Sequence, residues 1–83
     1  MNQDQLRGEI AAIIAEITEV PVEQVTPDAR LVQDLGADSM NALELLAAVE
    51  RRFSIVIDPS RLVDFETPAK VTALVSELLP RST

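Results

Sequence analysis

Apolar residues recur at helical spacing near the start of the chain, over residues 3–18. These positions are Leu6, Ile10, Ile13, Ile14 and Ile17. The spacing predicts a helix that buries one stripe. Asn2, followed three residues later by Gln5, resembles a capping box, although Asp4 is an alternative cap. Val20 precedes a proline and so avoids helical backbone, which ends this helix.

A second helix is predicted to begin at Asp38 or Ser39, because both are good N-cap residues and the apolar periodicity starts directly after them. Its wider apolar stripe is expected to face the core and comprises Ala42, Leu45, Leu46, Val49 and Phe53. A narrower stripe comprises Met40, Leu43 and Ala47, bordered by Glu44. Either another helix buries this second stripe or it is an exposed docking patch, and periodicity does not separate the two.

The connection over residues 19–38 is long for a small domain, which is typical of a loop with a function or with hidden local structure. One helical turn is predicted over 21–25, followed by turn chemistry at 26–28. Gly36 suits the turning point of the loop, because glycine adopts a positive φ without steric cost. The residues expected to hold the loop against the core are Leu31, Val32 and Leu35.

After the second helix, residues 53–57 form a β-branched run that could be a strand on propensity alone. The chain offers no second strand to pair with it, so we interpret it as an extended buried connector. Asp58, followed by proline, predicts a short helix over 59–64. Thr67, also followed by proline, predicts a last helix over 68–79 that Pro80 ends. Its expected inward positions are Val71, Leu74, Val75, Leu78 and Leu79.

These elements predict an all-α fold in a single domain, residues 1–83. The arrangement is a four-helix bundle with three main helices, one short helix and a long loop between helices one and two. Aromatic residues make up only 2% of the chain, against 47% for all hydrophobic residues, so the core must be aliphatic.

Composition removes several classes of function. The chain has no cysteine and no histidine, hence no thiol nucleophile, no thiolate metal site and no imidazole base. Without these groups we expect no catalytic residues. The acidic residues do not match the spacing of a calcium loop, so we also expect no dedicated metal site. A net charge of −7 disfavours nucleic acid and acidic membranes as partners. No apolar stretch reaches transmembrane length and no secretory signal is visible, so we expect a cytoplasmic protein. We also expect it to be a monomer.

Ser39 draws attention as a serine at the start of the most apolar helix. With no histidine in the chain it is not a credible hydrolase nucleophile. A serine in this place is most often only a helix cap. The alternative is that its oxygen carries a phosphate, which the unpaired N–H groups and the helix dipole would stabilise.

The segment Leu35-Gly36-Ala37-Asp38-Ser39-Met40 resembles the signature of acyl carrier proteins, usually Leu-Gly-x-Asp-Ser-Leu. The likeness extends over nearly the whole chain, from the isoleucine-rich first helix to the last helix. It implies that a phosphopantetheinyl transferase moves 4'-phosphopantetheine from coenzyme A onto Ser39. Asp38 and Ser39 would form the Asp-Ser pair that the transferase contacts. The thiol of the arm would then carry acyl groups as thioesters.

The resemblance also implies a partner-facing side of the second helix. The matching residues are Met40, Leu43, Glu44 and Ala47, and Arg51 on the same helix is also expected to contact partners. Expected partners are acyl-loading, condensing and modifying enzymes with basic docking patches. Acyl cargo could be sheltered among the helices, and candidate lining residues are Leu46, Ile57, Val63 and Phe65, which could equally be ordinary core.

Two features depart from the carriers of fatty acid synthesis. The second helix ends in Glu50-Arg51-Arg52 instead of an acidic run, and Asn41 stands where an acid is common. Phe65-Glu66-Thr67-Pro68 resembles a Phe-x-x-Pro segment of polyketide and nonribosomal peptide carriers. We therefore favour a discrete carrier of a polyketide-like pathway over housekeeping fatty acid synthesis.

Two alternatives stay open at this point. One is an aminoacyl or peptidyl carrier, and the other is a helical interaction module without an arm. Whichever holds, charge reversal at Arg51 or Arg52 is predicted to alter partner selectivity more than stability, because exposed charges contribute little to the fold.

Overall fold

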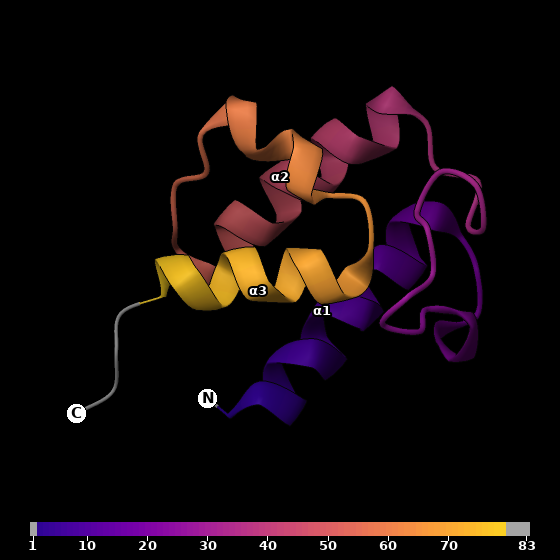
Figure 1. Ribbon diagram of the computed structural model, residues 1–83, viewed down its shortest axis with the longest axis horizontal. Helices are drawn as coiled ribbons and strands as arrows, with labels where there is room; N and C mark the ends of the chain where they lie inside the picture. The colour runs from indigo at the N-terminus through magenta and orange to yellow at the C-terminus, as the bar shows by residue number, and fades with distance from the viewer. Residues whose placement is uncertain (1, 80–83) are drawn as a thin grey trace.

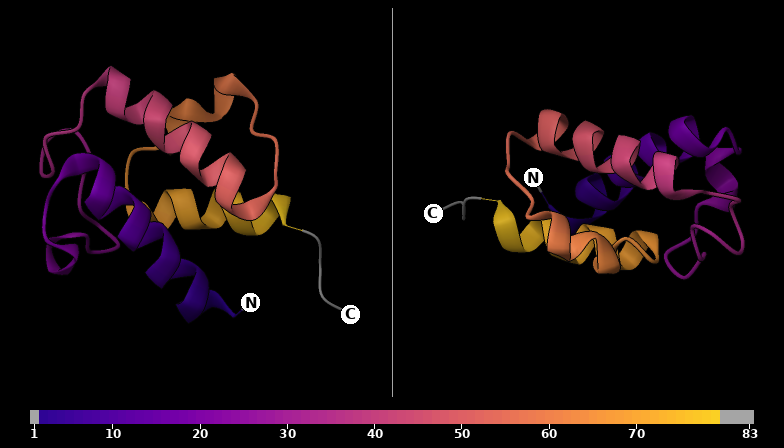
Figure 2. Two further views of the ribbon diagram at one scale, coloured as in Figure 1. Left: turned by 180° about the vertical axis from the view of Figure 1, so that it is seen from behind. Right: turned by 90° about the horizontal axis from the view of Figure 1, so that it is seen from above.

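The computed structural model describes residues 2–79 and, within that range, consists of helices and connections without a strand. The elements are α1 (Gln3–Thr18), η1 (Val22–Gln24), α2 (Ser39–Phe53), η2 (Pro59–Asp64) and α3 (Pro68–Leu78). α1 packs against both α2 and α3, and η2 packs against α3 (Figure 1). Seen from behind, α1 and α2 lie side by side with α3 crossing beyond them (Figure 2). The predicted all-α bundle is therefore confirmed.

The first helix begins and ends where its sequence predicts. Asn2 is the cap, since its Oδ1 accepts a hydrogen bond from the Gln5 backbone N–H at 2.8 Å. The Gln5 side chain accepts in return from the Asn2 N–H at 3.1 Å, which completes the capping box. Glu19 closes the helix in the left-handed conformation, with φ 59°.

The last two helices also start at their predicted caps. Asp58 accepts a hydrogen bond from the backbone N–H of Ser60, and Thr67 from that of Lys70. The short helix is of the 3-10 type. α3 ends one residue earlier than predicted, and the predicted stop at Pro80 lies outside the described residues.

The centre of the core is aliphatic. Ile10 and Ile14 from α1, Val49 from α2, and Val71 and Val75 from α3 are completely buried. Side chains of this size contribute about 1.5–3 kcal/mol each when fully buried. The core thus joins all three long helices and fixes the face that α2 turns outward.

Backbone hydrogen bonds attach the long loop between α1 and α2 to a segment that comes much later in the sequence. The Leu31 N–H donates to the Glu66 carbonyl at 3.0 Å, and the Ala69 N–H donates to the Pro27 carbonyl at 3.1 Å. Leu31 is buried, as predicted. These bonds tie the loop to the junction between η2 and α3.

Three valines expected on the inside are exposed instead. Val32, predicted to hold the loop to the core, is 61% exposed. Val56 in the connector and Val63 in η2 are 85% and 77% exposed. Val56 lies between the half-buried Ile55 and the buried Ile57, the alternation expected where successive side chains of an extended chain point to opposite sides. The run over 53–57 is therefore only partly the buried connector that was predicted.

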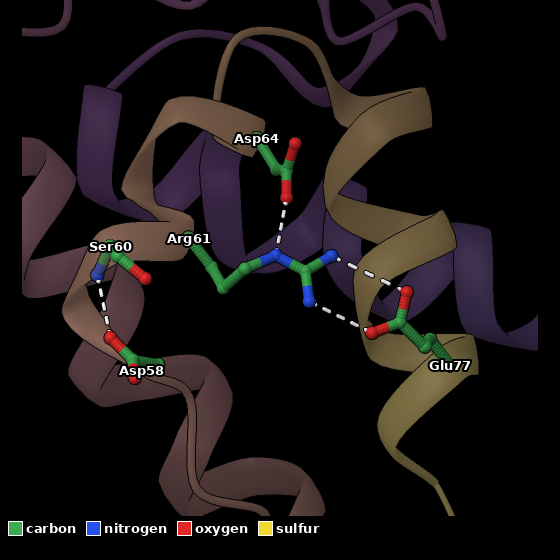
Figure 3. Close-up of polar contacts among 5 residues, drawn as sticks. All are labelled: Asp58, Ser60, Arg61, Asp64 and Glu77. Carbon is green, nitrogen blue, oxygen red and sulfur yellow. Dashed lines mark hydrogen bonds and ion pairs between the residues drawn. The ribbon is translucent and has the colours of Figure 1, made fainter.

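An arginine clamps η2 to α3. Arg61 Nε donates to Asp64 Oδ2 at 2.8 Å, and its Nη1 and Nη2 donate to the two carboxylate oxygens of Glu77 at 2.9 and 3.3 Å (Figure 3). These hydrogen bonds hold the pKa of Glu77 below its usual range and raise that of Arg61. We call Arg61, Asp64 and Glu77 the clamp.

Candidate functional site

Ser39 is the first residue of α2 and its side chain is exposed. The cap of this helix is Asp38, whose Oδ1 accepts a hydrogen bond from the Asn41 N–H at 2.8 Å. The Asn41 side chain accepts from the Asp38 N–H at 3.1 Å. The Ser39 hydroxyl makes no hydrogen bond to any residue between 2 and 79. Asp38 thus caps the helix, and the hydroxyl of Ser39 has no part in the capping.

The loop before Ser39 is fixed by local bonds. Gly36 has φ 74°, a conformation that costs glycine little and other residues about 1–2 kcal/mol. The Ala37 N–H donates to the Leu31 carbonyl at 2.8 Å, so the chain turns sharply here. Arg30 donates three hydrogen bonds to the Asp34 carboxylate, which lower its pKa. Several local hydrogen bonds therefore hold the turn that precedes the serine.

The start of α2 is electropositive. The first bond within the helix runs from the Ala42 N–H to the Asp38 carbonyl at 3.0 Å, so the N–H groups of Ser39 and Met40 precede the helical ladder. These donors and the helix dipole stabilise a negative charge placed beside them. A phosphate ester on the Ser39 oxygen fits this position.

The narrow apolar stripe of α2 is exposed. Met40 and Leu43 are 67% and 55% exposed, and Ala47 and Glu44 are also exposed. The alternative in which another helix buries this stripe is therefore wrong for the described chain. Large apolar side chains in a row beside Ser39 are typical of a contact surface.

The two arginines at the end of α2 have different surroundings. Arg52 forms an ion pair with Glu9 of α1, and its guanidinium lies over the Phe53 ring at 5.3 Å from the centroid. Arg51 is exposed and forms no ion pair within the described residues. The prediction that treated the two as equivalent is thus refined: Arg52 connects helices, whereas Arg51 is available.

A small cavity lies beneath the start of α2. Its volume is about 30 Å³, little more than one water molecule occupies. It is lined by Ile14, Ile17, Thr18, Leu31, Val32, Ala37, Asp38, Asn41, Ala42, Leu45 and Phe65. Of the four residues predicted to line a cargo site, only Phe65 is among them. Leu46, Ile57 and Val63 lie elsewhere, and nothing in their periodicity distinguished them from the residues that do line it.

Between residues 2 and 79, no three acidic side chains lie close enough together to hold a metal ion. None of the helices in this range is both long and apolar enough to cross a membrane.

Residues 8–75 match the family model described as "Phosphopantetheine attachment site". The chain is 33% identical to an acyl carrier protein of Saccharopolyspora erythraea over 98% of its own length and 85% of that protein. It is 32% identical to an acyl carrier protein of Thermosynechococcus vestitus over 92% of this chain and 94% of the relative. Over a shorter stretch, 59% of this chain and 63% of the relative, it is 51% identical to an acyl carrier protein of Helicobacter pylori.

These similarities span nearly all of the described fold, including Ser39 at the start of α2. Relatives of this kind are carriers that interact with modifying and biosynthetic enzymes. The chain belongs to the acyl carrier protein family, and its cofactor is covalently attached 4'-phosphopantetheine.

Proposed function

We propose that the Ser39 Oγ is the attachment point of the arm, and that the protein carries acyl groups as thioesters for a polyketide-like pathway. The observation that carries the first part is the exposed hydroxyl of Ser39, which takes no part in capping α2. The adjoining N–H groups and the positive end of the helix favour the phosphodiester that attachment creates.

The chemistry of attachment agrees with the residues present. The Ser39 oxygen forms a bond to the phosphorus of the pantetheine phosphate in coenzyme A. The pyrophosphate bond breaks, adenosine 3',5'-bisphosphate leaves, and the hydroxyl proton passes to the transferase. The chain lacks a histidine base, so a phosphopantetheinyl transferase must supply the catalysis. When bound, the arm supplies the thiol that this cysteine-free chain does not have.

Mass spectrometry tests the attachment. Apo protein incubated with coenzyme A and a promiscuous transferase should gain the mass of one phosphopantetheine, and Ser39→Ala should gain none. Ser60→Ala is the matched control, because Ser60 is also an exposed serine near an aspartate-capped helix start. Absence of a mass gain in the wild type would favour an interaction module, and a gain in Ser39→Ala would move the attachment elsewhere.

We also propose that partner enzymes dock on the outward side of α2. The contacting residues are Met40, Leu43, Glu44, Ala47 and Arg51. Exposed apolar side chains at 67% and 55% support this, as does the position of the row directly after Ser39. A few anchor residues near the centre of an interface each weaken binding by more than about 1 kcal/mol when truncated, and Leu43, in the middle of the exposed row, is placed to be one of them. Leu43→Ala should therefore lower kcat/KM for arm transfer about fivefold or more while leaving the melting temperature nearly unchanged.

The choice of pathway is supported by charge. A partner that recognises a continuous acidic face would meet Arg51 at the end of α2. The Phe-x-x-Pro segment carries less weight, because Phe65 and Pro68 are both buried where η2 joins α3. Loading assays decide the point: a polyketide malonyl transferase should charge the holo protein faster than a fatty-acid one. Charging by an amino-acid-activating enzyme would favour the peptidyl alternative.

A further inference from the structure

A groove of about 650 Å³ lies between α1 and α2. These two helices lie side by side when the molecule is seen from behind (Figure 2). Its lining comprises Ile13, Glu16, Ile17 and Glu19 from the α1 side and Glu44, Ala47, Ala48 and Arg51 from α2. The α2 residues follow helical spacing and so form one face. The half-buried lining residues are all apolar and the charged ones are all exposed, a composition that suits a contact surface.

Charges around the groove are not used within the fold. The glutamates at positions 16, 19 and 44 form no ion pair or side-chain hydrogen bond within residues 2–79. Arg51 likewise stands apart: every other basic side chain in that range has a carboxylate partner. An uncompensated arginine beside three uncompensated carboxylates offers a partner both signs of charge.

The groove is continuous with the narrow apolar stripe of α2, the proposed docking surface. Met40, Leu43 and Ala47 follow one another along the helix, and Ala47 is also a groove residue. A protein that touches the row next to Ser39 therefore reaches the groove without crossing another element. Its footprint would then include α1, which the sequence did not indicate.

We infer that the groove between α1 and α2 is the second half of the docking surface, and that it takes a surface segment of a partner enzyme with mixed charge. The segment places basic side chains against Glu16, Glu19 and Glu44 and one carboxylate against Arg51. This inference rests on the proposed carrier function. A uniformly basic partner is selected against, because its charge would face Arg51 without compensation.

Cross-linking to condensing enzymes tests the inference. A promiscuous transferase loads the chain with a chloroacetyl-tipped pantetheine arm, which alkylates an active-site cysteine with loss of chloride. The probes are two condensing enzymes, one whose carrier-binding patch is uniformly basic and one whose patch includes an aspartate or glutamate. The measured quantity is the rate of cross-linking.

The variants separate α1 from α2. Glu16→Gln/Glu19→Gln should slow cross-linking to the mixed-charge enzyme at least threefold. Asp4→Asn/Glu23→Gln is the control, because it makes the same change in net charge at exposed sites outside the groove. It should stay within twofold of the wild type. Equal rates for the two double variants would overturn the inference.

Charge reversal at Arg51 tests whether the groove discriminates between partners by the charge of their binding patches. Arg51→Glu should slow the mixed-charge enzyme about tenfold and accelerate the uniformly basic one. Equal slowing of both enzymes would overturn the inference, as would a wild-type dimer in sedimentation that Glu16→Gln/Glu19→Gln dissociates. Failure to load the arm is a different result: it would overturn the carrier function itself.

Discussion

The groove and the clamp use the same kinds of side chain in opposite ways. In the clamp, Arg61 donates to two carboxylates, one in its own helix and one in α3, so every charge has a partner inside the protein. In the groove, Arg51 stands among three glutamates of which it contacts none as an ion pair. The clamp charges thus stabilise the fold, whereas the groove charges remain available to pair with charges on another molecule, as inferred above.

Charge reversal at Arg52, compared with the same change at its neighbour Arg51, gives the largest expected effect on stability. Arg52→Glu removes the ion pair with Glu9 and the contact over Phe53, and places like charges together. We expect a loss of about 1–2 kcal/mol, a sum of typical exposed-pair and cation–π values. Arg51→Glu should change stability by less than about 0.5 kcal/mol. Thermal melts check both, and equal losses would remove the distinction between a connecting and an available arginine.

The cap beside Ser39 comes next. Asp38→Ala removes the acceptor for the Asn41 N–H and should cost about 1 kcal/mol. Asp38→Asn keeps an acceptor oxygen and should stay close to the wild type. If the transferase also contacts the carboxylate, Asp38→Asn lowers kcat/KM for arm transfer without lowering the melting temperature. Equal transfer rates for Asp38→Asn and wild type would leave Asp38 with a capping role alone.

Most of the fold was predictable because its signals are local. The capping box of Asn2 and Gln5 and the prolines after Asp58 and Thr67 determine where helices start, using residues within one turn of each other. The Asp38 cap behaves in the same way. Helix boundaries and the position of Ser39 therefore follow from short stretches of sequence.

The outward-facing valines show where local reasoning fails. η2 is a 3-10 helix, in which residues three apart share a face. Leu62 and Phe65 thus point inward together, and Val63 points out. In the loop, a single helical turn buries Leu31 and the residue four positions on, so Val32 is left outside. Hydrophobicity indicates burial only once the type of turn is known.

The ionic contacts could not be predicted for a different reason. Arg61 and Glu77 are far apart in the sequence, as are Glu9 and Arg52, and each pair meets only after the helices have packed. The groove is likewise a product of packing, since its two walls come from α1 and α2. Which arginine is paired and which is free is therefore information that only the three-dimensional arrangement contains.

Two helix ends in the same backbone conformation provide a smaller test. Glu19 and Ser54 both have left-handed backbones, with φ 59° and 55°. Glycine relieves this conformation, so Glu19→Gly and Ser54→Gly should each raise stability by about 0.5–1 kcal/mol. Only Glu19→Gly should also slow cross-linking to the mixed-charge enzyme, because only Glu19 borders the groove. Slower cross-linking in Ser54→Gly would count against that assignment.

Acid titration gives the smallest effect and the most direct contrast between the two regions. Arg61 lowers the pKa of Glu77 from its ordinary value of 4.5, while the nearby Asp64 charge opposes the shift. The resulting stability is present above pH 4.5 and is lost as the pH falls through the lower folded-state pKa. Wild type should therefore melt above Glu77→Gln at pH 7, and the gap should close in acid. The pKa values of Asp34 and Asp58 are also lowered, but their protonation destabilises the wild type and Glu77→Gln equally, so it does not change the gap.

Glu16→Gln is the matched change in the groove, because it removes a carboxylate that has no partner within the described residues. Its melting temperature should equal that of the wild type at pH 7. A gap as large as that of Glu77→Gln would mean that the groove also stabilises the fold.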